Sequence, residues 1–245
     1  MRVVAIIQAR MGSQRLPGKV LLDICGESML ARVVRRVQQS RLMDDVVVAT
    51  STDAADDAIV AAGESLGVQV VRGSEEDVLS RYVDAAKATN ADVVVRASAD
   101  SPFIDPEVCD LVVAAFLAAD PAVDYASNKL QPSFPLGLDV EAFSRDALER
   151  TASDAVEPYE RAHVTVHMYK NFDRFTLLPV ASSRNLHAWR WTVDTPEDLE
   201  FARAVFDRLG GRNDFSWKEV VSLIENEPGL AAINSHVVPK AIRDG

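Results

Sequence analysis

Three basic residues and two glycines lie close together near the N-terminus. Arg10, Arg15 and Lys19 are interspersed with Gly12 and Gly18. Guanidinium groups make forked contacts with phosphate oxygens, and a lysine ammonium acts as a point charge. Glycines let backbone N–H groups approach an anion. The stretch is therefore predicted to be a phosphate-binding loop, with Arg15 and Lys19 as the candidates for catalysis. The alternative is a basic surface loop whose charges are solvated.

The segment before this loop predicts where it lies in the fold. Residues 3–7 are a short apolar run rich in β-branched residues, typical of a strand buried on both faces. The loop then leaves the carboxyl edge of a sheet, where ligands bind in open α/β folds. Its sequence matches neither G-x-x-x-x-G-K-[ST] nor G-x-G-x-x-G, which disfavours a P-loop kinase or a dinucleotide-binding protein. As exposed loop cations, Arg15 and Lys19 should contribute little to stability.

Two aspartates are candidate metal ligands. Asp100 and Asp194 each follow an apolar run, so each is expected at the carboxyl end of a strand. Mg²⁺ is commonly held by one or two carboxylates together with phosphate oxygens. We therefore expect the two side chains to lie within about 8 Å of each other and to share one Mg²⁺. Helix N-capping is the alternative role for each aspartate.

The elements around these residues alternate between strands and helices. Strands are expected at 3–7, 46–49, 68–71 and 92–97, and helices at 29–37, 53–66, 76–88 and from Pro106 onward. This alternation predicts an α/β fold with a largely parallel sheet. Farther along, a strand is expected at 189–193, and helices at 196–209 and 216–225. Thr195 is a good N-cap and Pro196 a good first helical residue. The last twenty residues, including Asn234, Pro239 and Gly245, look like an unstructured tail.

The regular rhythm is lost between residues 120 and 190. Short strands are expected at 124–128, 138–143 and 175–180, and helices at 145–152 and 159–169. The 245 residues are predicted to form one domain, in which a region around 128–180 supplies an acceptor pocket or a dimer contact. Phe134, Phe172 and Phe175 lie in this region, and their apolar rings need a cover. A homodimer is therefore expected.

Composition excludes several classes of partner. The formal charge of -11 argues against nucleic acid or an anionic membrane as the main partner. No apolar run is long enough to span a membrane. The two cysteines, Cys25 and Cys109, form no C-x-x-C pair and are expected to be buried, reduced thiols. We therefore expect a cytoplasmic protein.

Several strings of this sequence resemble one known family. Residues 7–13 read IQARMGS and residues 15–19 read RLPGK, which closely resembles the signature of the acylneuraminate cytidylyltransferases, especially the SpsF-like branch of spore-coat polysaccharide proteins. Residues 193–200 (VDTPEDLE) resemble the C-terminal motif of the Kdo cytidylyltransferases, and residues 100–102 resemble the family's D-x-P turn. The resemblance extends from Ile7 to Leu199 and does not cover the region after Leu209.

Three further strings resemble the same branch. Residues 72–82 (RGSEEDVLSRY) match its R-G-S-x-x-D-V-L-x-R-Y string, and residues 137–141 (GLDVE) its G-x-D-x-E segment. Residues 161–165 (RAHVT) resemble an R-E-H-V-T string, but Ala162 replaces the usual glutamate, which weakens any acid–base role there. Arg81 and Tyr82 are equally well explained as helix-surface and core residues. His163 on its own is more typical of a structural histidine.

The resemblance implies a fold and roles for particular residues. The implied fold is a three-layer αβα arrangement with a mainly parallel mixed sheet, the Rossmann-like, GT-A-like fold of nucleotide-diphospho-sugar transferases. Asp100 and Asp194 would bind Mg²⁺ and the first loop would hold the triphosphate of CTP. The residues placed near the nucleotide are Ala9, Arg10, Gly12, Ser13, Thr50, Ser51, Arg72 and Ser74. Those placed near the acceptor are Asp139, Glu141, Arg161 and His163.

The implied activity is the transfer of CMP from CTP to an acidic sugar, such as a nonulosonic or 3-deoxy-2-keto sugar acid. Pyrophosphate is released, and the product would serve surface polysaccharide biosynthesis. Positioning and charge neutralisation dominate such a step, so no base with a strongly shifted pKa is required. Three alternatives remain: the same chemistry on a phosphonate or cyclitol phosphate, a glycosyltransferase that consumes a nucleotide sugar, and a nucleotide-binding module without turnover.

Overall fold

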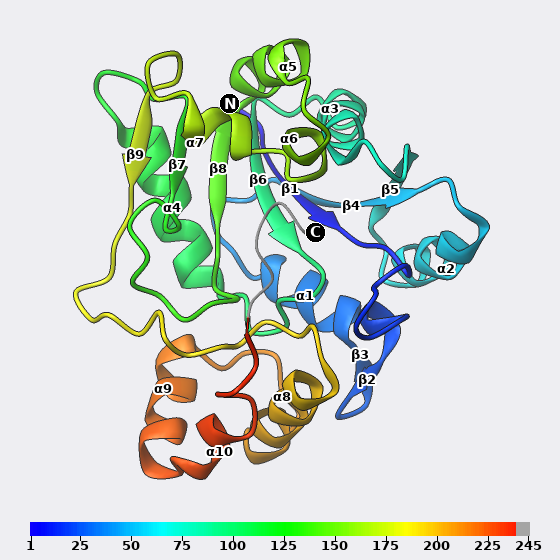
Figure 1. Cartoon of the computed structure of the whole chain (residues 1–245), viewed down its shortest axis with the longest axis vertical. Coiled ribbons are helices and arrows are strands. Elements are labelled where there is room, and N and C mark those ends of the chain that lie inside the picture. The colour runs from blue at the N-terminus through cyan, green and yellow to red at the C-terminus, as the bar shows by residue number, and fades with distance from the viewer. Residues whose placement is uncertain (239–245) are drawn as a thin grey trace.

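A mixed sheet lies at the centre of the computed structural model, which describes residues 1–238 (Figure 1). Its seven strands are arranged in the order β5-β4-β1-β6-β8-β7-β9. They span Val3–Gln8 (β1), Asp45–Ser51 (β4), Gln69–Gly73 (β5), Val93–Ser98 (β6), Tyr125–Ser127 (β7), Glu141–Ser144 (β8) and Leu177–Pro179 (β9). Strand β8 runs antiparallel to both of its neighbours, and the other pairings are parallel. The predicted α/β class and mainly parallel mixed sheet are confirmed.

Helices cover both faces of the sheet. Successive strand residues point to opposite faces, so Val3, Ala5 and Ile7 pack in one apolar cluster and Val4 and Ile6 in a second. The first cluster lies under α1, α2, α4, α8 and α9, and the second under α3 and α5. The three-layer arrangement follows from these two buried clusters.

The helices agree closely with the expected ranges in the first half of the chain. They span Met29–Val37 (α1), Asp57–Ser65 (α2), Val78–Ala88 (α3), Pro106–Ala118 (α4), Arg145–Asp154 (α5), Pro158–Ala162 (α6), Val166–Lys170 (α7), Pro196–Arg208 (α8), Trp217–Asn226 (α9) and Gly229–Ala232 (α10). Short 3-10 turns cover Lys19–Leu21 (η1) and Ala54–Asp56 (η2), and a small hairpin joins Asp23–Ile24 (β2) to Glu27–Ser28 (β3). Helix α8 begins with the predicted cap, a capping box between Thr195 and Asp198.

Between residues 138 and 193 the structure departs from the predicted elements in three places. The strand expected at 138–143 begins only at Glu141, because the Asn128 side chain bonds to the Leu138 carbonyl (2.7 Å) and the Val140 N–H (2.9 Å) in place of a ladder. The helix expected at 159–169 is broken into α6 and α7 around Val164, whose φ is 58°. The strand expected at 189–193 is wrong: this segment forms a single bridge, from Arg190 to Leu136.

The aromatic residues that suggested a dimer contact fall into two groups. Phe134 and Phe175 are buried within the chain, in the clusters on opposite faces of the sheet. Phe172 remains 78% exposed. Of the three residues, Phe172 alone still has an apolar ring that a partner subunit could cover. The dimer itself stays a prediction.

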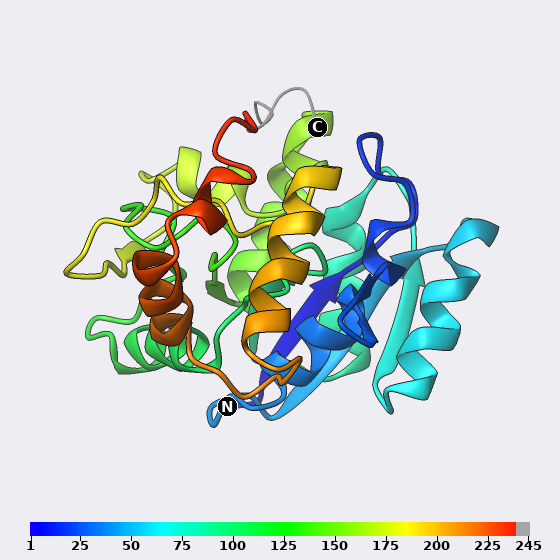
Figure 2. The same ribbon diagram turned by 90° about the horizontal axis from the view of Figure 1, so that it is seen from below.

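The C-terminal region is more ordered than expected. Helix α10 packs beside α8 and α9 (Figures 1 and 2), and Leu230 and Asn234 are buried. The expectation of a tail is wrong for this part, while Pro239 and Gly245 lie outside the described residues. Cys109 is buried and Cys25 half-buried, both as free thiols. Within residues 1–238, no helix has the length and apolar character needed to cross a membrane.

Candidate active site

The predicted phosphate loop leaves the carboxyl end of β1 between the ends of β4 and β6. The Ala9 N–H donates to the carbonyl of Ala49 in β4 (3.1 Å). The Ala99 N–H, just beyond β6, donates to the carbonyl of Gln8 (3.0 Å). These bonds fix the start of the loop at the sheet edge where open α/β folds bind their ligands.

A sharp return gives the loop its shape. The Met11 carbonyl accepts hydrogen bonds from the N–H groups of Ser13 (2.9 Å) and Gly18 (3.0 Å). Gly18 has a φ of 68°, in the left-handed region that favours glycine. A Cβ added at Gly18 would lie 3.2 Å from the Met11 methyl carbon. Gly18 therefore serves the turn that brings Lys19 back toward the sheet.

A buried carboxylate holds the loop from behind. Asp56, 2% exposed, accepts the Met11 N–H (2.7 Å) and the hydroxyls of Thr50 (3.0 Å) and Ser51 (2.5 Å). Burial opposes its ionisation, but these donors outweigh burial and lower the pKa of Asp56. Thr50 and Ser51 therefore act on the loop through Asp56 rather than by lining the cavity described next. In the sequence, Asp56 was recognisable only as an acidic residue at a helix start.

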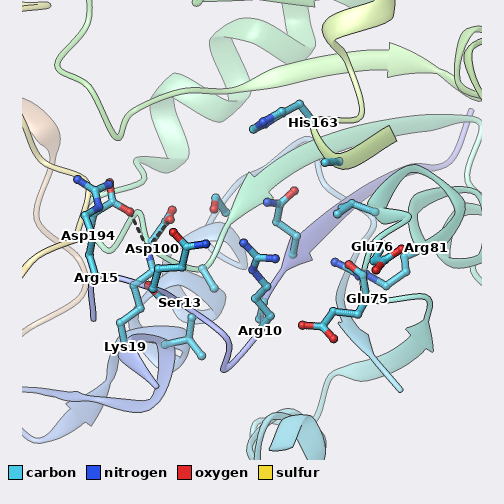
Figure 3. Close-up of a pocket in the computed structure, with 18 of the residues that line it drawn as sticks. Arg10, Ser13, Arg15, Lys19, Glu75, Glu76, Arg81, Asp100, His163 and Asp194 are labelled. Atoms are coloured by element: carbon cyan, nitrogen blue, oxygen red, sulfur yellow. Dashed lines mark hydrogen bonds and ion pairs between the residues drawn. The ribbon is translucent and has the colours of Figure 1, made fainter. Parts of the chain in front are cut away.

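A cavity of about 690 Å³ opens beside the loop (Figure 3). Charged side chains line both ends of it. Figure 3 shows one group formed by Arg15, Lys19, Asp100 and Asp194, a second formed by Glu75, Glu76 and Arg81, and Arg10 between the two. Gln8, Ala9, Ser13, Gln14, Ser98, Tyr159 and His163 also line the cavity. A cavity of this size accommodates a small-molecule ligand.

Lys19 joins the two predicted metal ligands. Its ammonium donates to Asp100 Oδ2 (2.8 Å), to Asp194 Oδ1 (2.8 Å) and to the Val193 carbonyl (2.8 Å). The two carboxylate oxygens are therefore at most about 5.6 Å apart, twice 2.8 Å, within the predicted limit. Burial opposes the charge on Lys19, but Asp100 and Asp194 outweigh it and raise the pKa of the ammonium. Lys19 is 7% exposed, so the expectation of an exposed loop cation is wrong for it.

Two arginines complete the surroundings of Asp194. Arg190 Nη2 lies 2.7 Å and Arg15 Nη2 3.1 Å from Asp194 Oδ2. Arg190 also donates to both oxygens of buried Asp198, at 2.8 and 2.9 Å. The Asp194 side chain is thus held by three cations and makes no capping bond, because Thr195 caps α8. Arg190 is not among the residues predicted from the sequence, where it falls in the segment expected to be a strand.

The residues assigned to the nucleotide divide into two groups. Ala9, Arg10 and Ser13 line the large cavity. Gly12, Arg72 and Ser74, like Thr50 and Ser51, are not among its lining residues. Arg72 donates to the carbonyls of Ser51 and Asp53 (both 2.8 Å) and pairs with Asp57 (2.6 Å). The Ser74 hydroxyl accepts the Asp77 N–H (3.1 Å). These two side chains fix the segment that leads into α3.

Arg81, left open from the sequence, lines the cavity although it is 2% exposed. Its guanidinium donates to the carbonyls of Ser74 and Glu75. A Cβ at Gly73 would lie 2.7 Å from Arg81 Cγ, so that glycine makes room for the side chain. Tyr82 is fully buried in the core and directs its hydroxyl to the Ile6 carbonyl (3.2 Å).

A second cavity of about 270 Å³ adjoins the first and shares Arg15, Ser98, Asp100 and Asp194 with it. Both predicted metal ligands thus lie where the two cavities meet. The other residues of this second cavity are Arg96, Ala97, Ser101, Lys129, Leu136, Gly137, Asp139, Glu141, Arg190 and Thr192. Asp139 and Glu141, assigned to the acceptor, are therefore both brought to it.

Glu141 has its carboxylate oxygens already engaged. Oε1 accepts from Arg96 (3.0 Å) and Lys129 (2.9 Å), and Oε2 accepts from the Thr165 hydroxyl (2.5 Å). Burial opposes ionisation, but Lys129, Arg96 and Thr165 outweigh it and lower the pKa of Glu141 to about 2. At Asp139, burial prevails over Lys129 and raises the pKa. Glu141 therefore orients two cations of the cavity wall.

The two remaining acceptor candidates lie elsewhere. Arg161 lines neither cavity: it pairs with Asp77 (2.7 Å) and donates to the carbonyls of Ala152 and Ala155. It therefore ties α5 and α6 to the start of α3. His163 lines the large cavity rather than the small one (Figure 3). Among residues 1–238, no group of three or more His, Cys, Asp or Glu side chains is arranged to hold a metal ion.

Comparison with known proteins places the chain in a family. The cytidylyltransferase family profile matches residues 4–223. The spore coat polysaccharide biosynthesis protein SpsF of Bacillus subtilis is 34% identical, over 94% of this chain and 96% of its own length. The 3-deoxy-manno-octulosonate cytidylyltransferase of Anaeromyxobacter dehalogenans strain 2CP-C is 30% identical, over 83% of this chain and 97% of its own length.

A solved structure agrees along nearly the whole chain. A cytidylyltransferase from Leptospira borgpetersenii superimposes with a TM-score of 0.91 at 33% identity, covering 98% of this chain and 100% of its own. The sheet, the basic loop and the paired aspartates described above thus occur in a chain that belongs to the cytidylyltransferase family.

Proposed function

We propose that this cytidylyltransferase transfers CMP from CTP to an acidic sugar and releases pyrophosphate. One observation carries the proposal: a large and a small cavity meet at Asp100, Asp194 and Arg15, residues that both cavities share. A nucleotide in the large cavity and an acceptor in the small one would meet at these side chains. The acceptor hydroxyl would attack the α-phosphorus there, and the bond to the bridging oxygen of pyrophosphate would break.

The basic side chains around the large cavity suit a triphosphate. Arg10 is exposed and extends into the cavity, and Arg15 lies at the border between the cavities (Figure 3). Their guanidinium groups would neutralise the phosphate oxygens and the charge that develops on leaving pyrophosphate. Lys19 adds a third cation at the same end. The chain as a whole carries a formal charge of -11, so these clustered cations contrast with an otherwise acidic protein.

Asp100 and Asp194 fit a Mg²⁺ site. Their carboxylates converge on one point, where the Lys19 ammonium supplies the positive charge. One or two carboxylates are the usual protein ligands of a Mg²⁺ ion whose remaining ligands are phosphate oxygens and water. The ion would neutralise the triphosphate and polarise the α-phosphorus. Arg190 would keep Asp194 oriented during this exchange of cations.

The small cavity suits a polyhydroxylated acid. Its wall offers Lys129 as a cation for a carboxylate, and Asp139 and the hydroxyls of Ser101 and Thr192 as partners for sugar hydroxyls. One relative is named as a 3-deoxy-manno-octulosonate cytidylyltransferase, an enzyme for a 3-deoxy sugar acid. Another, SpsF, is named as a spore coat polysaccharide biosynthesis protein. Both support a 2-keto-3-deoxy sugar acid or nonulosonic acid as acceptor, and surface polysaccharide as its destination.

A screen for pyrophosphate release tests the proposal. The four nucleoside triphosphates are each combined with Kdo, a nonulosonic acid, a phosphonate and a cyclitol phosphate, with Mg²⁺ present. Release that requires CTP and a sugar acid is the expected result. Release with only the phosphonate or the cyclitol phosphate would move the acceptor class and keep the transfer chemistry. Consumption of a CMP-sugar without pyrophosphate would contradict the proposed reaction.

We also propose that the enzyme is a homodimer, with a contact in the region around 128–180. Val156 and Phe172 are 79% and 78% exposed in this region, which is unusual for large apolar side chains. A second copy of the chain would provide the cover that these side chains lack.

A further inference from the structure

The segment of residues 229–235, called here the C-terminal segment, is hydrogen-bonded to the site through Asn234. Asn234 is 2% exposed, and its Nδ2 donates to the Arg190 carbonyl (3.0 Å) and to Asp198 Oδ1 (2.9 Å). These two partners stand on either side of Asp194 in the chain. Asn234 therefore links both sides of the turn that carries a predicted metal ligand.

The two residues that Asn234 contacts, Arg190 and Asp198, also orient Asp194 through other atoms. The Arg190 guanidinium bonds to Asp194 Oδ2 (2.7 Å) and to both oxygens of Asp198 (2.8 and 2.9 Å). Asp198 Oδ2 in turn accepts the backbone N–H groups of Asp194 (3.0 Å) and Thr195 (3.1 Å). A displacement of Asp198 would thus move both the backbone and the arginine partner of Asp194.

Hydrogen bonds rather than close packing join the C-terminal segment to the turn from Arg190 to Asp198. A cavity of about 310 Å³ lies between the chain at 188–191 and the chain at 231–235, with Asn234 in its lining. Leu230, 4% exposed, anchors α10 in the core. Apolar contact therefore fixes the start of the segment, and the Asn234 amide fixes its end against the site.

The segment lies beyond the residues that the family profile matches. The cytidylyltransferase profile ends at residue 223, before α10 begins at Gly229. The two aspartates and the basic loop all lie within the profile. The bond between Asn234 and Asp198 is consequently made by a part of this chain that the family profile does not describe.

We infer that Asn234 is a positioning residue for nucleotidyl transfer, which holds the turn from Arg190 to Asp198 so that Asp194 faces Asp100. This inference rests on the proposed role of Asp194. Partners that orient metal ligands without contacting the ion commonly change metal affinity or activity by about 10- to 100-fold when they are removed. The chain would thereby couple its C-terminal segment to the metal site.

The test compares Asn234→Ala with Asn226→Ala, the same change at an exposed position in the same part of the chain. Mn²⁺ binding in the presence of CTP is followed by electron paramagnetic resonance, and kcat and KM for CTP are measured at saturating metal. We expect Asn234→Ala to weaken Mn²⁺ binding and lower kcat, each by about 10-fold or more, with little change in KM for CTP. Asn234→Asp should be more damaging, because it places a negative charge against Asp198. Asn226→Ala should behave as the wild type.

A second variant keeps the test valid if Asn234→Ala folds poorly. Leu230→Ala leaves the amide in place but loosens the anchor of α10, so a smaller loss of Mn²⁺ affinity is expected. Wild-type Mn²⁺ binding and kcat in the Asn234 and Leu230 variants, with only a lower unfolding temperature, would overturn the inference. Asp194→Asn separates a failure of the Asn234 inference from a failure of the proposed role of Asp194. If Asp194→Asn also binds Mn²⁺ and turns over normally, the proposed role of Asp194 fails.

Discussion

Removing the charge of Lys19 should destabilise the protein in a way that a divalent cation repairs. Lys19→Met keeps an unbranched apolar stem but removes the ammonium, and it leaves Asp100 and Asp194 facing each other, with oxygens at most about 5.6 Å apart, twice 2.8 Å. At an effective dielectric constant of about 20, two charges at that separation repel by about 3 kcal/mol. The carboxylates are each 24% exposed, so screening reduces the cost to roughly 1–3 kcal/mol. For a chain of this size, the unfolding midpoint should fall by about 2–12 °C.

Thermal unfolding of the nucleotide-free protein measures this effect. Addition of Mg²⁺ should raise the midpoint of Lys19→Met more than that of the wild type, because no ammonium then competes for the two carboxylates. Arg10→Ala is the matched control, since Arg10 is an exposed cation of the same loop and its loss should leave the midpoint unchanged. A Lys19→Met midpoint equal to that of the wild type, with no added response to Mg²⁺, would refute this reasoning.

The remaining predictions concern the loop, the second cavity, the metal and the dimer. Arg10→Ala should raise KM for CTP in steady-state assays, and an unchanged KM would remove Arg10 from the triphosphate site. Because the pKa of Glu141 is lowered to about 2, its stabilisation is complete above the unfolded value near 4.5 and is lost as pH falls toward 2. Denaturant titrations should accordingly show that the difference in free energy of unfolding between the wild type and Glu141→Gln shrinks between about pH 5 and pH 2. A difference that stays constant over this range would contradict the cause given for the lowered pKa of Glu141. Asp100→Asn and Asp194→Asn should each abolish most turnover and combine less than additively in kinetic assays, and full additivity would argue against one shared ion. Phe172→Ser should weaken a dimer in light scattering, and a wild-type monomer at micromolar concentration would exclude the dimer.

The α/β core could be predicted because its signals are local. The apolar run at 3–7, the start of α4 at Pro106 and the capping residue Thr195 all have a meaning that depends on their immediate neighbours. Tertiary contacts decide the rest. Asn128 replaces backbone pairing before β8 with side-chain bonds, and Arg190 is buried because it reaches two aspartates rather than because it lies in a strand.

The candidate site was predictable in its types of residue more than in its contacts. The cations of the loop and the pair Asp100 and Asp194 stand out by their position after apolar runs, and the structure brings the pair together. The burial of Lys19 between them depends on a separation of 175 positions, from Lys19 to Asp194, which no local pattern reveals. The roles of Asp56 and Asn234 are equally non-local, because each acts through residues that the chain brings near only on folding.

Release of pyrophosphate by the purified enzyme measures the proposed reaction itself. The wild type and Asp194→Asn are assayed with CTP and a panel of sugar acids, with Mg²⁺ and then with excess chelator. We expect the wild type to release pyrophosphate only with CTP, a sugar acid and the metal, and Asp194→Asn to lose most of this activity. Undiminished release by Asp194→Asn, or in excess chelator, would contradict this expectation.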